Sequence, residues 1–233
     1  MSILSAMQSA TIRLVGQKPA VFFTSSDQLE LEIVDLVNEV ARDICRYADW
    51  QALTKVYNVP TDGVTEIFDL PEDYDRQLLV TDIQDLNNCV WGYEHIENLN
   101  DFLYRRARNF EVTPGAWTIY QNQIHFFPPP NVQNSATYPY ISNNYALDSN
   151  NAGKPEFTAD TDDFIIKGGN DLLTLGLIWR WRENKKLDYT GDQEQFTMAL
   201  DQIAAKDKGT NVYRARSRSR RLNTHLAWPF ELG

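Results

Sequence analysis

The chain has 233 residues, of which 42% are apolar and 12% aromatic, so it can bury a substantial core and is not disordered throughout. Its formal net charge of −10 argues against nucleic acid and acidic membranes as partners of the whole surface, because like charges repel. No apolar stretch approaches the roughly 20 residues of a membrane span, and the N-terminus lacks signal-peptide features. We therefore expect a soluble protein made in the cytosol.

Two amphipathic helices are predicted near the N-terminus. The first covers residues 3–15 and ends near Gly16, a residue that readily terminates helices. The second covers residues 27–48, where apolar side chains recur every three or four positions and so share one face. Asp27 and Glu30 have the spacing of a capping box at its start, with Ser25 and Ser26 as alternative caps. Cys45 lies within the apolar pattern and is expected to be a buried free thiol.

After residue 52 the pattern of apolar residues changes from that of a helix to that of β-strands. Segments 53–59 and 64–70 flank the turn sequence PTDG and predict one hairpin. Segments 117–120 and 124–127, with Gln-Asn-Gln between them, predict a second hairpin. A short helix is expected at residues 96–108. Three consecutive prolines after residue 127 should end the β-region, because proline cannot continue a strand ladder.

Residues 131–151 are rich in Asn, Ser and Pro and predict a long loop, and a long ordered loop in a compact protein usually contacts another molecule. Three aromatic side chains are the candidates for that contact: Tyr138, Tyr140 and Tyr145. Helices are predicted again at residues 168–186 and 192–206.

These elements predict an α+β protein with a mainly helical core, a bundle, into which a small β-rich subdomain is inserted. The helical core would comprise residues 1–52 and 167–207, the insertion residues 53–166, and an extended basic C-terminal arm residues 208–233.

Motifs for catalysis and cofactor binding are missing from the sequence. It contains no phosphate-binding glycine loop, and the three histidines are too widely spaced to form a metal site along one helix. Asp160, Asp162 and Asp163 could bind a hard cation in a metal-dependent hydrolase, but they lack the glycine and terminal glutamate of a calcium loop. A solvated acidic loop explains them better. We therefore predict that the protein is not an enzyme and that it binds neither a cofactor nor a metal ion.

The arm carries the strongest functional signal. Residues 206–221 hold seven basic residues and one acid, a net charge of +6, so the rest of the chain carries −16. Alternate residues of an extended chain point the same way, so alternating arginines would form a comb that fits a row of carboxylates or a phosphate backbone. Aromatic residues near the end favour a protein pocket. The predicted partner-binding residues are Arg214, Arg216, Arg218, Arg220, Arg221, Trp228 and Phe230. A basic tail that is merely solvated, and a nucleic-acid-binding module, remain alternatives.

Four segments resemble the head-to-tail adaptor (connector, or head-completion) proteins of tailed bacteriophages. They are LELEIVDLVNEVARDICRYADWQAL at 29–53, FDLPEDYDR at 68–76, ENLNDFLYRRARNFEVTPGAWTIYQNQIHFFPPP at 97–130 and FTADTDDFIIKGGNDLLTLGLIWRWREN at 157–184. The similarity lies in their order more than in a short motif and covers most of residues 5–205.

The resemblance implies a structural protein of the virion neck. Such adaptors form a ring, commonly of twelve copies, beneath the portal protein, extend the channel through which packaged DNA passes, and give tail or neck proteins a docking surface. A C-terminal arm often inserts against the portal. Acidic grooves between portal subunits would then be the partner of the arginine comb.

Overall fold

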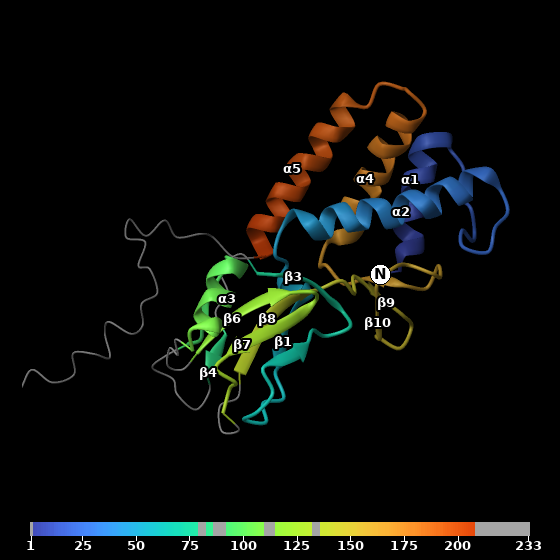
Figure 1. Ribbon diagram of the computed structural model, residues 1–233. Coiled ribbons are helices and arrows are strands. Elements are labelled where there is room, and N and C mark those ends of the chain that lie inside the picture. The colour runs from blue at the N-terminus through green and yellow to red at the C-terminus, as the bar shows by residue number, and fades with distance from the viewer. Residues whose placement is uncertain (1, 79–82, 86–91, 110–114, 132–135, 208–233) are drawn as a thin grey trace, which may run out of the picture. The chain divides into compact units, whose positions relative to one another are not determined.

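The computed structural model describes residues 2–78, 83–85, 92–109, 115–131 and 136–207. It confirms the α+β class, since helices and small sheets both contribute to the fold (Figure 1). The chain divides into two compact units, and the described residues of the first are 2–54 and 141–207. Those of the second lie between residues 55 and 140. The C-terminal arm lies outside the described residues.

The first unit is built on four helices: α1 (Ile3–Val15), α2 (Gln28–Tyr47), α4 (Gly169–Asn184) and α5 (Thr190–Asp207). All four were predicted from the sequence, the last three from their apolar periodicity. At the start of α2, Asp27 occupies the N-cap position but its side chain makes no capping hydrogen bond, so the predicted capping box does not form. Helix α1 ends at Gly16, whose φ of 73° is a left-handed conformation that glycine adopts without strain.

Helix α4 is central to this unit, because it contacts α1, α2 and α5 (Figure 1). Most of its circumference is therefore buried, including Leu172, Leu177 and Trp179. Gly176 allows the close approach to α2. A Cβ atom there would lie 2.3 Å from Cγ1 of Val40, far inside van der Waals contact.

A three-stranded sheet of order β10-β9-β11 completes the first unit, with β9 (Ala146–Leu147), β10 (Gly153–Lys154) and β11 (Asp163–Phe164). A single 3-10 turn, η1 (Gln51–Leu53), follows α2. The N-terminus is tied to the small sheet, because the Ile3 N–H donates to the Asp162 carbonyl at 2.8 Å.

In its described residues the second unit contains two four-stranded sheets and one helix. In the first sheet the order is β1-β8-β3, and β4 also pairs with β8; in the second it is β2-β7-β6-β5. The bounds are β1 (Thr54–Asn58), β2 (Ile67–Asp69), β3 (Tyr74–Gln77), β4 (Gln84–Asp85), β5 (Glu94–His95), β6 (Ala116–Tyr120), β7 (Gln123–Phe127), β8 (Ala136–Ser142) and α3 (Leu99–Ala107).

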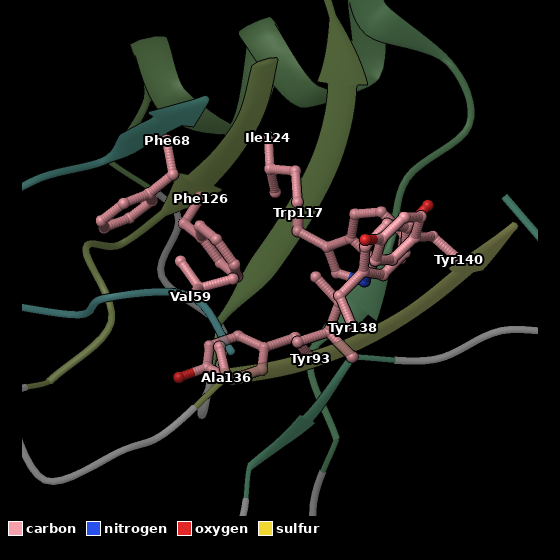
Figure 2. Close-up of a cluster of buried hydrophobic side chains, with 10 residues drawn as sticks. Val59, Phe68, Tyr93, Trp117, Ile124, Phe126, Ala136, Tyr138 and Tyr140 are labelled. Carbon is pink, nitrogen blue, oxygen red and sulfur yellow. The ribbon is translucent and has the colours of Figure 1, made fainter. Parts of the chain in front are cut away.

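An aromatic cluster forms the core of the second unit. Trp117 and Tyr138 are fully buried and meet edge to face, with ring centroids 5.4 Å apart (Figure 2). Phe126 packs edge to face against both Phe68 and Tyr93. Such contacts add to the free energy gained from burying large apolar surfaces.

The prediction of a hairpin across residues 53–70 is wrong. Strand β1 pairs with β8, and β2 pairs with β7, so the two segments lie in different sheets. The turn sequence does shape the intervening loop, because the Asp62 carboxylate accepts hydrogen bonds from the N–H groups of Val64 and Thr65. A local turn therefore formed without the strand pairing that we inferred from it.

The second predicted hairpin is confirmed. Strands β6 and β7 are antiparallel, with Tyr120 opposite Gln123 and Ala116 opposite Phe127. Gln121 and Asn122 link them with φ angles of 54° and 59°. Two successive positive φ angles match the twist of a two-residue type I′ turn.

Candidate functional site

The predicted binding residues of the arm, Arg214 to Arg221 together with Trp228 and Phe230, lie outside the described residues. The segment that precedes them is well anchored. The Asp207 carboxylate accepts a hydrogen bond from the N–H of Gln51 at 2.8 Å, and Tyr47 donates to Asp201. The first contact joins the end of α5 to η1 and the second joins α5 to the end of α2, so Asp207, after which the arm begins, is fixed beside η1.

The three candidate tyrosines are buried in the protein's own cores. Tyr138 is fully buried and Tyr140 is 5% exposed, both on one face of β8. Tyr145 is 3% exposed and its hydroxyl donates to Asn38 at 3.0 Å. Residues 131–151 contain β8 and β9 where a long loop was expected, and strand alternation directs Tyr138 and Tyr140 inward. These rings stabilise the fold and are not exposed for a partner.

Each of the three aspartates considered as metal ligands, Asp160, Asp162 and Asp163, has a structural environment of its own. The Asp160 carboxylate accepts a hydrogen bond from the Phe22 N–H, and the Asp162 carboxylate pairs with Lys154. Asp163 belongs to β11, paired with Leu147. Among the described residues, no group of three or more His, Cys, Asp and Glu side chains could hold a metal ion.

The histidines of the second unit pack against aromatic rings. His95 stacks on Trp117 with ring centroids 4.2 Å apart, and His125 stacks on Tyr120 at 3.6 Å. Burial lowers the pKa of His125, so this imidazole is neutral near pH 7. His225 lies outside the described residues. The imidazoles of His95 and His125 therefore contribute packing to the sheet.

A groove in the first unit was not predicted from the sequence. Two adjoining hollows of about 380 and 200 Å³ share Glu32, Trp181 and Lys185 in their walls. The Lys185 ammonium lies 2.8 Å from the Glu32 carboxylate and 5.5 Å from the centroid of the Trp181 ring. The hydrogen bond from Lys185 lowers the pKa of Glu32 and keeps this carboxylate ionised.

Carboxylates continue from this groove along α2. Glu32, Asp35, Glu39 and Asp43 are spaced three or four residues apart and so share one side of the helix; we call these four residues the α2 acidic ridge. Arg180 of α4 lies beside it, 2.7 Å from Asp43 and 3.7 Å from Glu39. The spacing of the ridge was visible in the sequence, but Trp181 of α4 and Lys185, the residue after α4, come about 150 residues later in the chain.

The arrangement provides charged and aromatic groups for binding rather than a catalytic constellation. Helix α4 packs along α2, which brings Trp181 of α4, and Lys185 directly after that helix, to the groove. Carboxylates beside an aromatic ring form a site for a guanidinium or ammonium group, which can pair with the acid and stack on the ring. None of the helices in the described part of the chain is both long and apolar enough to cross a membrane.

Comparison with known proteins places the chain in a family. A model of the SU10 adaptor protein family matches residues 1–225, which include both units and the arginines of the arm. No curated protein matches the chain. The match covers nearly the whole chain and supports the resemblance to phage adaptors that was inferred from the sequence. The chain belongs to the SU10 adaptor protein family, a family of phage structural adaptors rather than enzymes.

Proposed function

We propose that the protein is the head-to-tail adaptor of a phage virion, made in the host cytoplasm and located in the neck. It forms a ring of twelve copies, docks on the portal protein through its C-terminal arm, extends the DNA channel and connects the capsid to tail or neck proteins. The observation that carries this proposal is the family match over residues 1–225, because it includes the arginine-rich segment as well as the folded units.

The chemistry of the arm supports the portal as its partner. Arg214, Arg216, Arg218 and Arg220 alternate with small residues, so an extended arm presents them on one side. Guanidinium groups bind carboxylates through paired hydrogen bonds, which suits a row of acidic grooves in a ring. Trp228 and Phe230 supply the large apolar surfaces that usually dominate binding energy.

The charge distribution suits a channel through which DNA slides. The chain carries −10 in total and residues 206–221 carry +6, so the remaining residues carry −16. An acidic wall repels the phosphate backbone and keeps DNA from adhering. The arm is the exception, and a protein partner that covers its arginines would remove the main DNA-binding surface.

The test of portal docking compares three forms of the protein in sedimentation with purified portal at about 0.15 M salt. The first is the native sequence, the second ends after Asp207, and the third has all five arginines of residues 214–221 replaced by glutamine. The truncation keeps Asp207 because its carboxylate bonds Gln51. We expect only the native chain to sediment with portal. Equal sedimentation of all three forms would refute docking through the arm.

Two further measurements test the remaining parts of the proposal. Mass measurement of the portal complex should give twelve adaptor copies, and another number would refute the stated ring. A nucleic-acid-binding module would instead bind duplex DNA with a logarithmic salt slope near −4.5, about 0.9 for each of five arginines. We expect weak DNA binding with a shallow slope, because the acidic units oppose it.

A further inference from the structure

The groove of the first unit has the chemistry of a receptor for arginine side chains. Its wall includes the Trp181 ring with Lys185 above it and Glu32 beside it, and Asp35 is exposed at the same edge. We propose that this groove, with the α2 acidic ridge, is the resting site of the chain's own arginine segment, residues 214–221, before the arm engages a partner. The inference rests on the proposed function, because it concerns the same arm.

Lys185 already shows what kind of group the groove accepts. Its ammonium occupies the position between a carboxylate and an aromatic ring, 2.8 Å from Glu32. A guanidinium fits such a position better than an ammonium, since it is planar, stacks on rings and donates paired hydrogen bonds. An arginine of the arm can therefore replace or join Lys185 there.

Charge complementarity favours the arm as the occupant. Beside the four carboxylates of the α2 acidic ridge lies Glu183, which bonds Arg180 at 3.1 Å. Arg180 and Lys185 supply two positive charges against these five negative charges, and Arg42 and Arg46 on the same side of α2 supply two more, which leaves −1. The arm, residues 208–233, has six basic residues and one acid, or +5. The ridge thus stays acidic after its own ion pairs are counted.

The arm is long enough to reach the groove of its own chain. Asp207 is held at Gln51, near the end of α2, and Glu32 lies 15 residues before Tyr47, about 22 Å along the helix. Residues 208–214 can extend about 24 Å and residues 208–221 about 48 Å. The reach of the arm at Arg214 therefore covers the ridge, and its reach at Arg221 exceeds the distance to the groove. Both ends belong to the first unit, so no motion between units is required.

Attachment within one chain has a physical advantage over attachment to a neighbour. A short tether holds the arm at an effective concentration in the millimolar range, so weak surface ion pairs suffice to retain it. A stronger partner with matching carboxylates and an apolar pocket can then displace it. The resting site would keep the arginines from binding nucleic acid before assembly.

The experiment measures tryptic cleavage within residues 214–221 in the intact, portal-free protein. The test variant is E32Q/D35N, which neutralises the groove edge. The matched control is E156Q/E194Q, which removes the same charge from two exposed positions outside the groove. At about 0.05 M salt, we expect the arm of the test variant to be cut about tenfold faster than that of the native chain and the control. Salt at about 0.5 M should abolish the difference.

Each outcome decides the proposal. Cleavage that is slow in the native chain and control, at the same rate over about a hundredfold range of protein concentration, supports attachment within one chain. Protection that grows with concentration, together with a dimeric mass, would overturn it in favour of a neighbour's arm. Equal rates in all three proteins would overturn it outright. Because portal is absent, these results are independent of whether the arm later binds portal.

Discussion

The Lys154 ammonium lies 2.7 Å from the Asp162 carboxylate, whose side chain is only 2% exposed. The same carboxylate accepts hydrogen bonds from the N–H groups of Thr158 and Ala159, at 2.8 and 3.0 Å. It therefore fixes the loop between β10 and β11 and compensates its own burial with one cation and two backbone donors. Asp162, one of the acidic residues considered for metal binding, thus stabilises the fold of this loop.

Replacing Asp162 with asparagine should lower the free energy of unfolding by about 2 kcal/mol, because the buried charge partner of Lys154 is lost. Urea denaturation followed by tryptophan fluorescence measures the change. Glu156→Gln is the control, since this exposed residue should alter stability by less than about 0.5 kcal/mol. Equal unfolding midpoints for both variants would contradict the role assigned to Asp162.

The Asp162 pair also predicts the pH dependence of stability. Burial raises the pKa of Asp162, but the Lys154 hydrogen bond and the two backbone donors outweigh burial, so the pKa is lowered. A lowered pKa stabilises the fold above the ordinary aspartate value, and this stabilisation is lost as the pH falls through the lowered value. The difference between the native chain and Asp162→Asn should thus be constant near pH 6–7 and shrink below about pH 4. A difference that persists unchanged in acid would exclude this origin.

Gly176→Ala should destabilise the first unit by about 2 kcal/mol, because the added Cβ would overlap Val40. Thermal or urea unfolding measures the loss. Gly191→Ala is a matched control near the start of α5, since a Cβ there meets nothing within 4 Å and should leave stability unchanged or slightly higher. The double variant Gly176→Ala/Val40→Ala should lose about 1 kcal/mol less than the sum of the two single losses, because removing the Val40 methyl groups relieves the overlap. Strict additivity of the two changes would contradict the proposed overlap.

The β6–β7 turn should respond to residues that favour positive φ. Changing Gln121 to asparagine and Asn122 to glycine should raise the free energy of unfolding by about 0.5 kcal/mol, because this pair is preferred in type I′ turns. Gln121→Val should lower it by about 1 kcal/mol, since a β-branched residue resists φ of 54°. Opposite signs in urea denaturation would support the turn assignment, whereas a loss in both variants would contradict it.

Local sequence patterns predicted the helices and one hairpin well. Apolar periodicity identified α2 and α4, and the two-residue gap between β6 and β7 was enough to predict their pairing. Strand pairing over long separations was not predictable in this way. Strands β1 and β8 are about 80 residues apart, and the turn between β1 and β2 gave no sign of their separate partners. The proline and polar residues around Tyr138 also concealed the strand pattern of β8, in which Tyr138 and Tyr140 lie on one buried face.

For the candidate site, too, local features could be predicted from the sequence and features that join distant segments could not. The arginine comb is a local pattern and could be seen in the sequence, as could the spacing of the α2 acidic ridge. The groove depends on Trp181 and Lys185 meeting α2, which the folded chain alone brings about. Signals confined to one helix or one strand were therefore readable, and those that join distant segments were not.

The helical unit draws its parts from both ends of the described chain, and this order governs how it forms during synthesis. Helices α1 and α2 leave the ribosome first, but α4, which covers their apolar faces, begins about 120 residues after α2 ends. At a translation rate of about 5–20 residues per second, the apolar faces of α1 and α2 remain exposed for roughly 6–24 s before α4 has been synthesised. Nascent chains should accordingly be most prone to aggregate, and most dependent on chaperones, during that interval.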